Sequence, residues 1–340
     1  SGNDNSSTAN QVGVGNQGGV GYWGTNQIGN DNTSTTSSVG DNNQTGTVQS
    51  GNDNEAHIDQ QGDNNDANFN TSWGYGIQQV GSENIASLTQ IGDNNISSTE
   101  QTGDLNESST LQQGTLNDSD VEQDGDGNNA VTDQNGSNNE SDITSVGNDN
   151  TAWVRQGYFA AGGNDHISDI DQTGDNNYSE VGQDGTSNES DIDQIGDANV
   201  STVYQIGIDN SSVVNQNGTG NNSYVDQQGS NNGISNVDQD GTSNVSVVYQ
   251  RVDGNDSNVI QDGMSNDSYV FQNGNSNESD VNQLGDDNES DVNQTGNDHM
   301  SNVMQDGMLN ISNVTQTGNN HISTVNQLGN SNNSTVTQSN

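Results

Sequence analysis

The sequence predicts an all-β protein, a two-sheet β-solenoid of about 14 stacked coils of 22 residues each. Three observations support this fold. A glutamine recurs every eleven residues, glycine and asparagine keep fixed places between successive glutamines, and residue character alternates over the seven residues that end at each glutamine. Self-similarity at a fixed period is typical of solenoid proteins, in which each repeat buries its surface against its neighbours.

The repeat has 29 units, whose anchor residues run from Gln11 to Gln338, and only Ser38 and Ser145 replace the anchor glutamine. Counted from the anchor, glycine occupies position +2, asparagine +5, a small residue +7 and a β-branched residue +9. In the regular stretch after Asn282, the predicted core-facing residues are Gln283, Asn288, Ser290, Val292, Gln294, Asn310, Ser312, Val314 and Gln316. The predicted arc glycines there are Gly285, Gly296, Gly307 and Gly318.

Positions +5 to +11 alternate between two kinds of residue, which is the signal of a β-strand with one face turned inward. The four residues between strands contain glycine, as a tight reversal of the chain requires. Each unit is therefore expected to be one strand followed by one arc. A single strand cannot bury its inner face, so two units should make one coil. Stacked coils would then place glutamine on glutamine and asparagine on asparagine, in amide ladders like those of amyloid.

The composition alone is typical of disorder, which is one alternative interpretation. The 340 residues carry a formal charge of −46, and only 24% are hydrophobic. The absence of proline instead favours a continuous β ladder, and the regularity of the repeat makes disorder improbable. The negative charge excludes nucleic acid and anionic membrane surfaces as partners. No apolar run predicts membrane insertion. The sequence shows no charged-then-apolar signal peptide, so we expect a mature or trimmed form if the protein is secreted.

We expect a single repeat domain over residues 1–340, interrupted by irregular arcs. These arcs lie near residues 12–26, 61–78, 157–171, 228–238 and 251–254. All follow odd-numbered units, so a two-unit coil should place them on the same edge. The aromatic residues Tyr22, Trp23, Trp73, Tyr75, Trp153, Tyr158 and Phe159 lie in or beside three of them. We interpret these aromatic clusters as covers for disturbed arcs, with a binding role as the alternative.

The terminal units look like interior units. The first begins at Ser1 with the usual Gly2, Asn5 and Gln11, and the last strand stops two residues after Gln338. Repeat proteins normally end in atypical caps, and open strand edges are templates for pairing with another chain. We therefore expect a subunit that polymerises end to end.

The spacing Asn-x5-Gln-x-Gly-x2-Asn-x5-Gln, visible from Asn277 to Gln294, resembles the curlin repeat of the curli major subunit. The resemblance spans essentially the whole chain. It implies a secreted bacterial functional amyloid that forms extracellular fibres for adhesion and biofilm matrix, an outer-membrane secretion channel, and a minor subunit that nucleates growth. The chain departs from the family in its larger number of coils, the near-equivalence of the two halves of each coil, and its stronger negative charge. This charge should oppose assembly at low salt.

Little in the repeat suggests other chemistry. His166, His299 and His321 fall in or near asparagine slots, and we interpret them as polar substitutes for asparagine, with a metal site as the alternative. The segment from Asp124 to Asn129 resembles the start of an EF-hand loop but lacks its final glutamate, so we expect an ordinary arc and no resident metal or cofactor. Arg155 and Arg251 could pair with nearby carboxylates or mark a contact between fibres.

The sequence thus predicts a structural, non-enzymatic subunit of a curli-like fibre, with the chain itself as the main partner. The alternative is a monomeric solenoid that binds Ca²⁺ or ice. Ice binding would favour a flat, regular outer array, whereas the outer positions here vary from Glu289 and Asp291 to Met300 and Met304.

Overall fold

The structure, a computed structural model, describes residues 2–18, 24–67, 76–157 and 163–340, and all regular elements of this part are β-strands. It confirms the predicted all-β solenoid of about 14 coils of roughly 22 residues. Contacts divide the chain into two compact units, Ser1–Asn176 and Asn177–Asn340. The single domain predicted over residues 1–340 stays a prediction. The described residues contain no helix that could cross a membrane.

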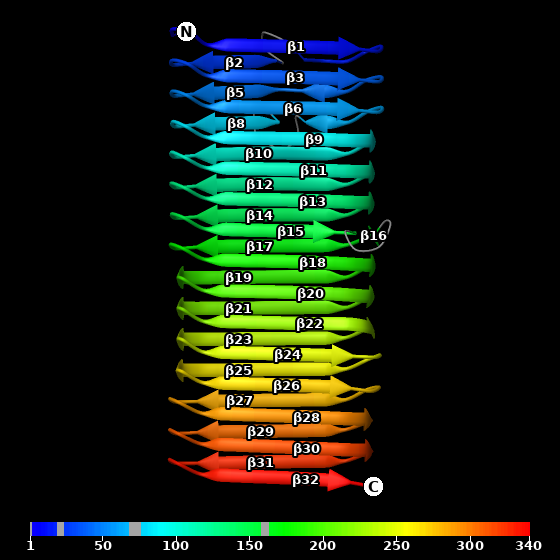
Figure 1. Cartoon of the computed structure of the whole chain (residues 1–340), viewed down its shortest axis with the longest axis vertical. Coiled ribbons are helices and arrows are strands. Elements are labelled where there is room, and N and C mark those ends of the chain that lie inside the picture. The colour runs from blue at the N-terminus through cyan, green and yellow to red at the C-terminus, as the bar shows by residue number, and fades with distance from the viewer. Residues whose placement is uncertain (1, 19–23, 68–75, 158–162) are drawn as a thin grey trace. The chain divides into compact units, whose positions relative to one another are not determined.

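Two parallel sheets form the first unit, and apart from three two-residue strands, successive strands of the chain alternate between them (Figure 1). Sheet 1a contains β1 (Ser6–Val12), β3 (Thr33–Val39), β6 (Glu55–Gln61), β9 (Ile85–Asp93), β11 (Glu107–Thr115), β13 (Asn129–Ser137) and β15 (Thr151–Gln156), with the short β16 (Gly163–Asn164) beside β13. Sheet 1b contains β2 (Thr25–Ile28), β5 (Thr47–Ser50), β8 (Ile77–Val80), β10 (Ile96–Thr102), β12 (Asp118–Asp124), β14 (Glu140–Val146) and β17 (Ile167–Thr173), with the short β4 (Gln44–Thr45) and β7 (Asp66–Ala67).

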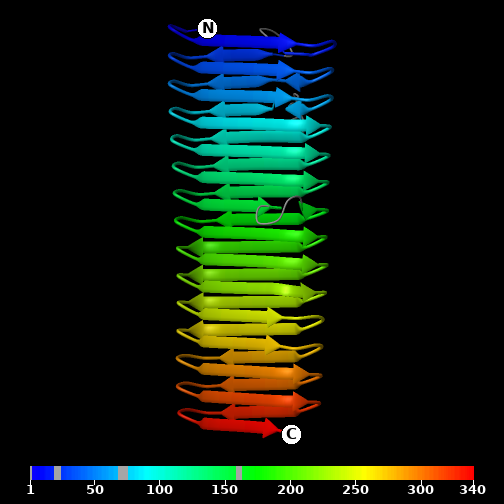
Figure 2. The same ribbon diagram turned by 45° about the vertical axis from the view of Figure 1, so that its right-hand side comes forward.

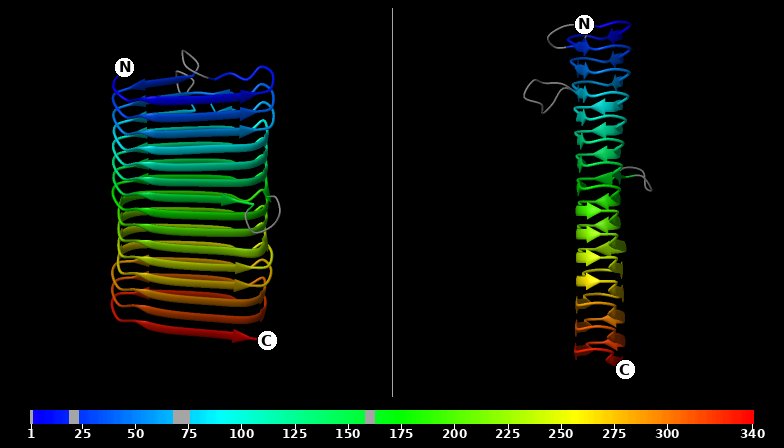
Figure 3. Two further views of the ribbon diagram at one scale, coloured as in Figure 1. Left: turned by 45° about the horizontal axis from the view of Figure 1, so that its top comes forward. Right: turned by 90° about the vertical axis from the view of Figure 1, so that its left-hand side faces the viewer.

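The second unit repeats this arrangement. Sheet 2a contains β18 (Tyr178–Thr186), β20 (Val200–Ile208), β22 (Asn222–Asn231), β24 (Val245–Arg251), β26 (Asp267–Asn273), β28 (Glu289–Asn297), β30 (Ile311–Asn319) and β32 (Asn333–Ser339). Sheet 2b contains β19 (Glu189–Asp197), β21 (Ser211–Thr219), β23 (Ile234–Thr242), β25 (Asp256–Met264), β27 (Glu278–Leu284), β29 (Met300–Asp306) and β31 (Ile322–Leu328). Within each unit the strands of a sheet lie one above another (Figure 2), and the edge-on view shows two layers (Figure 3).

Equivalent residues stack on one another in the regular coils. Between β28 and β30, for example, Val292 pairs with Val314 and Gln294 with Gln316. This register is specified because a slip of one residue would turn the inward side chains to solvent. The core is accordingly thin. Each regular strand buries one β-branched residue, one small residue and one glutamine, which is how a chain with so few apolar residues can still exclude water.

The strands differ from the predicted seven-residue segments. β28 begins one residue after Asn288 and runs three residues beyond Gln294 into the arc. The reason is that arcs of stacked coils also pair through their backbones, as when Gly285 donates its N–H to the carbonyl of Asp262 at 2.8 Å. The ladder therefore continues around parts of the arcs.

The structure describes the irregular arcs only in part. Those near residues 12–26, 61–78 and 157–171 include residues outside the described part of the chain, as do all the predicted aromatic clusters except Trp153. The arc after β22 is described. The register between β20 and β22 shifts by one residue there, because Gly207 pairs with Ser230 and leaves Gly229 as the extra residue of a bulge.

Candidate functional site

The anchor glutamines form buried ladders within each unit. Gln283 donates one amide hydrogen bond from Nε2 to Oε1 of Gln305 at 2.9 Å, and a second to the main-chain carbonyl of Asp267 at 2.8 Å. Gln294 makes the same pair of bonds, to Gln316 at 3.0 Å and to the carbonyl of Glu278 at 2.8 Å. Each glutamine thus connects successive coils and also crosses the narrow core to the facing sheet.

The asparagines form a second ladder, at the start of each strand. The main-chain N–H and the Nδ2 group of Asn310 both donate to Oδ1 of Asn288, at 3.1 and 3.0 Å. Asn288 bonds in the same way to Asn266 and also donates to the carbonyl of Gly307 at 3.0 Å. The asparagine therefore holds the arc as well as the stack.

The two ladders point in opposite directions along the stack. Glutamine amides donate toward the following coil, whereas asparagine amides donate toward the preceding coil. One edge of any coil therefore presents glutamine donors and asparagine acceptors, and the other edge presents the complementary groups. A coil edge of one copy is chemically matched to the opposite coil edge of another copy.

The remaining predicted ladder residues are valines and serines, whose buried side chains fill the core between the sheets. Val292 and Val314 are completely buried, and Ser290 and Ser312 are each only 1% exposed. The two serine hydroxyls have no hydrogen-bond partner in the described protein. Alanine occupies the same slot at Ala130. The slot therefore selects a small side chain, and its hydroxyl is dispensable. That these ladder residues drive fibre formation stays a prediction.

The arcs use two residues with positive φ, and sequence reasoning found only one. Gly285 and Gly296 have φ values of 104° and 125°, as the glycine slot requires. Two positions later, Asp287 and Asp298 adopt the left-handed conformation at 54° and 56°. Asp and Asn tolerate this conformation best, and their frequency at position +4 was the available signal.

His299 and His321 occupy asparagine slots and make asparagine-like contacts. Nε2 of His299 lies 3.2 Å from the carbonyl of Thr295, and its Nδ1 accepts the main-chain N–H of His321 at 3.3 Å. The two rings stack with centroids 5.2 Å apart. These contacts confirm the interpretation as asparagine substitutes. The described residues contain no group of three or more His, Cys, Asp or Glu side chains placed to hold a metal ion.

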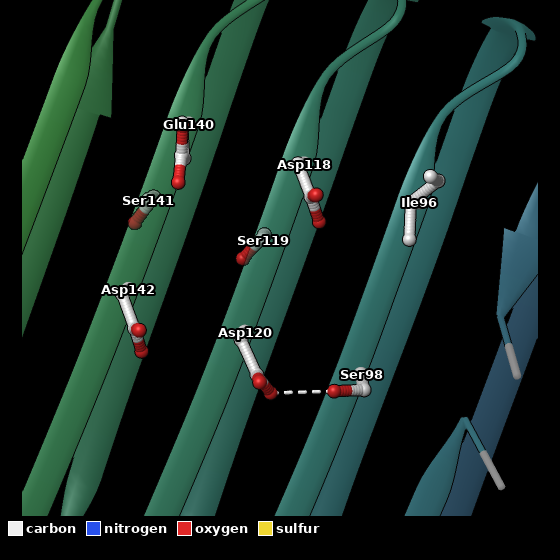
Figure 4. Close-up of a pocket in the computed structure, with 8 residues that line it drawn as sticks. All are labelled: Ile96, Ser98, Asp118, Ser119, Asp120, Glu140, Ser141 and Asp142. Atoms are coloured by element: carbon white, nitrogen blue, oxygen red, sulfur yellow. Dashed lines mark hydrogen bonds between the residues drawn. The ribbon is translucent and has the colours of Figure 1, made fainter. Parts of the chain in front are cut away.

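A cluster of carboxylates lies on the outer surface of sheet 1b (Figure 4). Asp118 and Asp120 of β12 lie beside Glu140 and Asp142 of β14, and Ser98 of β10 donates a hydrogen bond to Asp120. Burial and the charges of Glu140 and Asp120 raise the pKa of Asp118 to about 6. Burial, followed by the charges of nearby acids, raises the pKa of Asp142 to about 7. Asp142 is exposed, so solvent screens part of this repulsion, and half-buried Asp118 is the better reporter.

The folded protein is expected to be more stable at about pH 5 than at about pH 8. A carboxyl group with a raised pKa binds a proton in the fold that it loses in the unfolded chain, whose aspartates have a pKa of about 4. The stabilising contribution of these two carboxyl groups is therefore fully present below about pH 4, and it is lost as the pH rises through 6 to 7. Urea midpoints across this range would measure the loss. The variant Asp118→Asn/Asp142→Asn should flatten the profile, and an unchanged slope would contradict the assignment.

Replacing Gln294 by alanine should destabilise the surrounding coils by roughly 2–4 kcal/mol. The change removes the acceptor of the Gln272 amide, leaves Oε1 of Gln316 without its donor and opens a cavity. Serine is the matched control, because Ser145 occupies an anchor slot and still donates to Oε1 of Gln172 at 3.1 Å. Hydrogen exchange of the amides in β26, β28 and β30 should rise less for Gln294→Ser than for Gln294→Ala. Equal effects would show that the ladder bond contributes little.

Both arginines lie on outward positions beside aromatic rings. Arg251 forms a two-bond ion pair with Asp226, and its guanidinium carbon lies 5.4 Å from the ring centroid of Tyr249. Arg155 lies over the ring of Trp153 at 5.0 Å. For Arg251 the structure thus shows the first of the two alternatives, pairing with a neighbouring carboxylate.

A model of the curlin associated repeat family matches five segments of the chain, residues 114–147, 163–196, 185–218, 258–285 and 274–307. The chain therefore contains curlin repeats in these segments. No curated protein sequence matches it significantly. Curlin repeats belong to structural proteins that form extracellular fibres, so together with the β-solenoid fold they indicate that this curlin-repeat protein is a curli-type structural subunit.

Proposed function

We propose that this curlin-repeat protein is the subunit of an extracellular amyloid-like fibre that grows by end-to-end stacking of its coils. The observation that carries the proposal is the opposite polarity of the glutamine and asparagine ladders. An added copy can continue both ladders and both backbone sheets in the same register, so that the joint repeats the contacts between coils within one chain. Such in-register stacking of identical residues gives amyloid its stability.

Electrostatic repulsion should control this growth. Two chains of formal charge −46 repel one another, and salt screens that repulsion. Assembly is therefore expected to be slow at low salt and faster at moderate salt.

By likeness to its family, the protein is expected to be secreted, exported through an outer-membrane channel and nucleated by a minor subunit. The fibre would then serve adhesion and the biofilm matrix. Export is testable by expressing the chain with and without the channel and measuring it outside the cell. Retention of the protein inside cells that have the channel would contradict this part of the proposal.

Electron microscopy and fibre diffraction of the purified chain, incubated in moderate salt, test the main proposal. We expect unbranched fibres with a meridional reflection near 4.8 Å, the spacing between paired strands. Persistent monomers with the circular dichroism of β-structure would contradict it. That result would favour the monomeric binding solenoid, which calorimetry with Ca²⁺ and an ice-recrystallisation assay would then examine.

A further inference from the structure

Four tyrosines form a row of rings on the outer surface of sheet 2a. Tyr204, Tyr224, Tyr249 and Tyr269 belong to β20, β22, β24 and β26, and successive ring centroids lie 6.1, 5.6 and 5.9 Å apart. The rings are tilted or edge-on to their neighbours, which is a favoured geometry for aromatic pairs. Since the row crosses four adjacent strands, it runs along the direction of stacking.

The strand register places these rings in two neighbouring columns of outward residues. One column holds Thr202, Tyr224, Val247 and Tyr269, and the other holds Tyr204, Asp226, Tyr249 and Phe271. We call these eight residues the tyrosine face. The glutamine and asparagine ladders that hold stacked coils together consist of inward residues, so they do not account for a row of aromatic side chains on the outside. Half-exposed aromatic surface of this kind is characteristic of contact sites.

The tyrosine face and the adjacent Arg251 together have no net charge. Asp226 is its one acidic residue, and Arg251 neutralises it through two hydrogen bonds of 2.9 Å each. The Asp226 side chain is only 4% exposed, so little of its carboxylate reaches solvent. The guanidinium of Arg251 also lies over the ring of Tyr249 and so covers part of the row of tyrosines. The face with Arg251 therefore carries no net charge, although the formal charge of the chain is −46.

Acidic residues border the tyrosine face and also lie on the opposite surface of the same unit. The column of Tyr224 continues into Glu180 on β18 and Asp291 on β28. The outward positions of sheet 2b include Asp191, Asp193, Asp238 and Asp280. Two copies that approach through these acidic positions would bring like charges directly together, whereas two tyrosine faces would bring together only the acids at their borders.

We propose that the tyrosine face is a lateral contact between two copies of this chain, which pairs neighbouring fibres side by side. The inference rests on the proposed fibre function. The chemistry of the face selects the occupant, because its aromatic rings fit against the rings of an identical face, and its paired Asp226 leaves no charge for a cationic or anionic partner to bind. The bordering acids of two copies repel one another, so this pairing should require salt. In a second tyrosine face, the aromatic rings can pack against those of the first, and Asp226 is again paired with Arg251.

The size of the face explains why pairing should require fibres. Four strands about 4.8 Å apart and about five residues of about 3.3 Å each give roughly 300 Å². A stable pair of separate proteins usually buries about 800 Å² per partner. Single subunits should therefore pair weakly. A fibre repeats the face once per subunit, and many weak contacts acting together bind strongly.

The test compares wild-type fibres with Tyr224→Thr/Tyr249→Thr fibres by cryo-electron microscopy and sedimentation. Threonine is compatible with these columns, as Thr202 and Thr315 show, so the variant should fold and polymerise. The control is Ile260→Thr/Met304→Thr, which removes comparable apolar side chains from the outer surface of sheet 2b. Salt would be raised from about 0.1 M to about 1 M, over which the Debye length falls from about 10 Å to about 3 Å.

Wild-type and control fibres are expected to pair or bundle increasingly as salt rises, and at least a tenfold smaller fraction of the tyrosine variant should do so. Equal bundling of the variant, or single wild-type fibres at every salt concentration, would overturn the lateral contact while leaving fibre growth intact. If the wild type forms no fibres, the proposed function fails instead. The face is then tested by sedimentation of concentrated monomers of the wild type and of the tyrosine variant. If the wild type associates no more than the variant, this inference is overturned too.

Discussion

A chain in which proline replaces Val203 is expected to lose fibre growth. Val203 is fully buried in β20, between Val181 of β18 and Val225 of β22. Proline has no N–H to donate to the ladder, and its ring clashes with neighbouring backbone, so it is confined to edge strands and bulges. The carbonyl that loses its N–H donor is left unsatisfied, which costs about 1–3 kcal/mol at that coil in addition to the clash. Because each coil contacts only its neighbours, the break should divide the stack into two shorter segments.

Val203→Ala is the matched control for this change. Alanine keeps the N–H and loses only side-chain packing, at a cost of roughly 1–3 kcal/mol. Fibre growth followed by thioflavin fluorescence and electron microscopy should continue for the alanine variant and stop for the proline variant. Normal growth with proline at position 203 would contradict the assignment of β20 as a central strand.

The sequence was sufficient to predict the strands because its two periods act together. The period of two identifies an inward face, and the period of eleven identifies how often the chain reverses. The structure confirms both in β28 and β30, where equivalent residues pair. The extension of strands into the arcs could not be predicted, since it depends on how closely the arcs of neighbouring coils approach.

The left-handed position +4 was missed for a different reason. Asp and Asn there are natural choices for positive φ, yet Leu105 and Leu309 adopt it too, at 62° and 57°. A leucine in this conformation is disfavoured on local grounds. Its neighbours in the stack impose the arc on it, and local propensity alone cannot reveal that.

The ladders and the tyrosine face show where sequence reasoning about the site ends. The stacking of Gln283 on Gln305 follows from the spacing, but the direction of amide donation depends on side-chain geometry across the core. The tyrosines were not singled out because they fall in two different outward positions of the repeat. Aligning the sequence on a grid of one coil places Tyr204 and Tyr249 in one column, with Tyr224 and Tyr269 in the next.

Gly296→Ala is expected to be among the most destabilising substitutions of a single methyl group. Gly296 has a φ of 125°, which L-residues rarely adopt, and an added Cβ would overlap the carbonyl oxygen of Gly318 in the next coil. Backbone strain of about 1–3 kcal/mol and overpacking of about 1–3 kcal/mol act together, because the obstructing atom belongs to a backbone that stacking holds in place. We expect a loss of roughly 3–5 kcal/mol, measured by hydrogen exchange in β28 and β30.

Gly254→Ala is the control, a methyl group added to an arc where it meets no close neighbour. Gly254 also has a positive φ, 65°, but its nearest obstacle is the hydroxyl of Ser276 at 3.7 Å. Alanine is accepted in the equivalent position at Ala198, whose φ is 56°. Gly254→Ala should therefore cost about 1 kcal/mol or less. Comparable losses for the two variants would contradict the expected clash at Gly296. A much larger loss at Gly296 would reflect both its φ of 125°, which lies outside the left-handed region that Ala198 adopts, and the close approach of stacked coils. A growing fibre must reproduce that close approach at every joint.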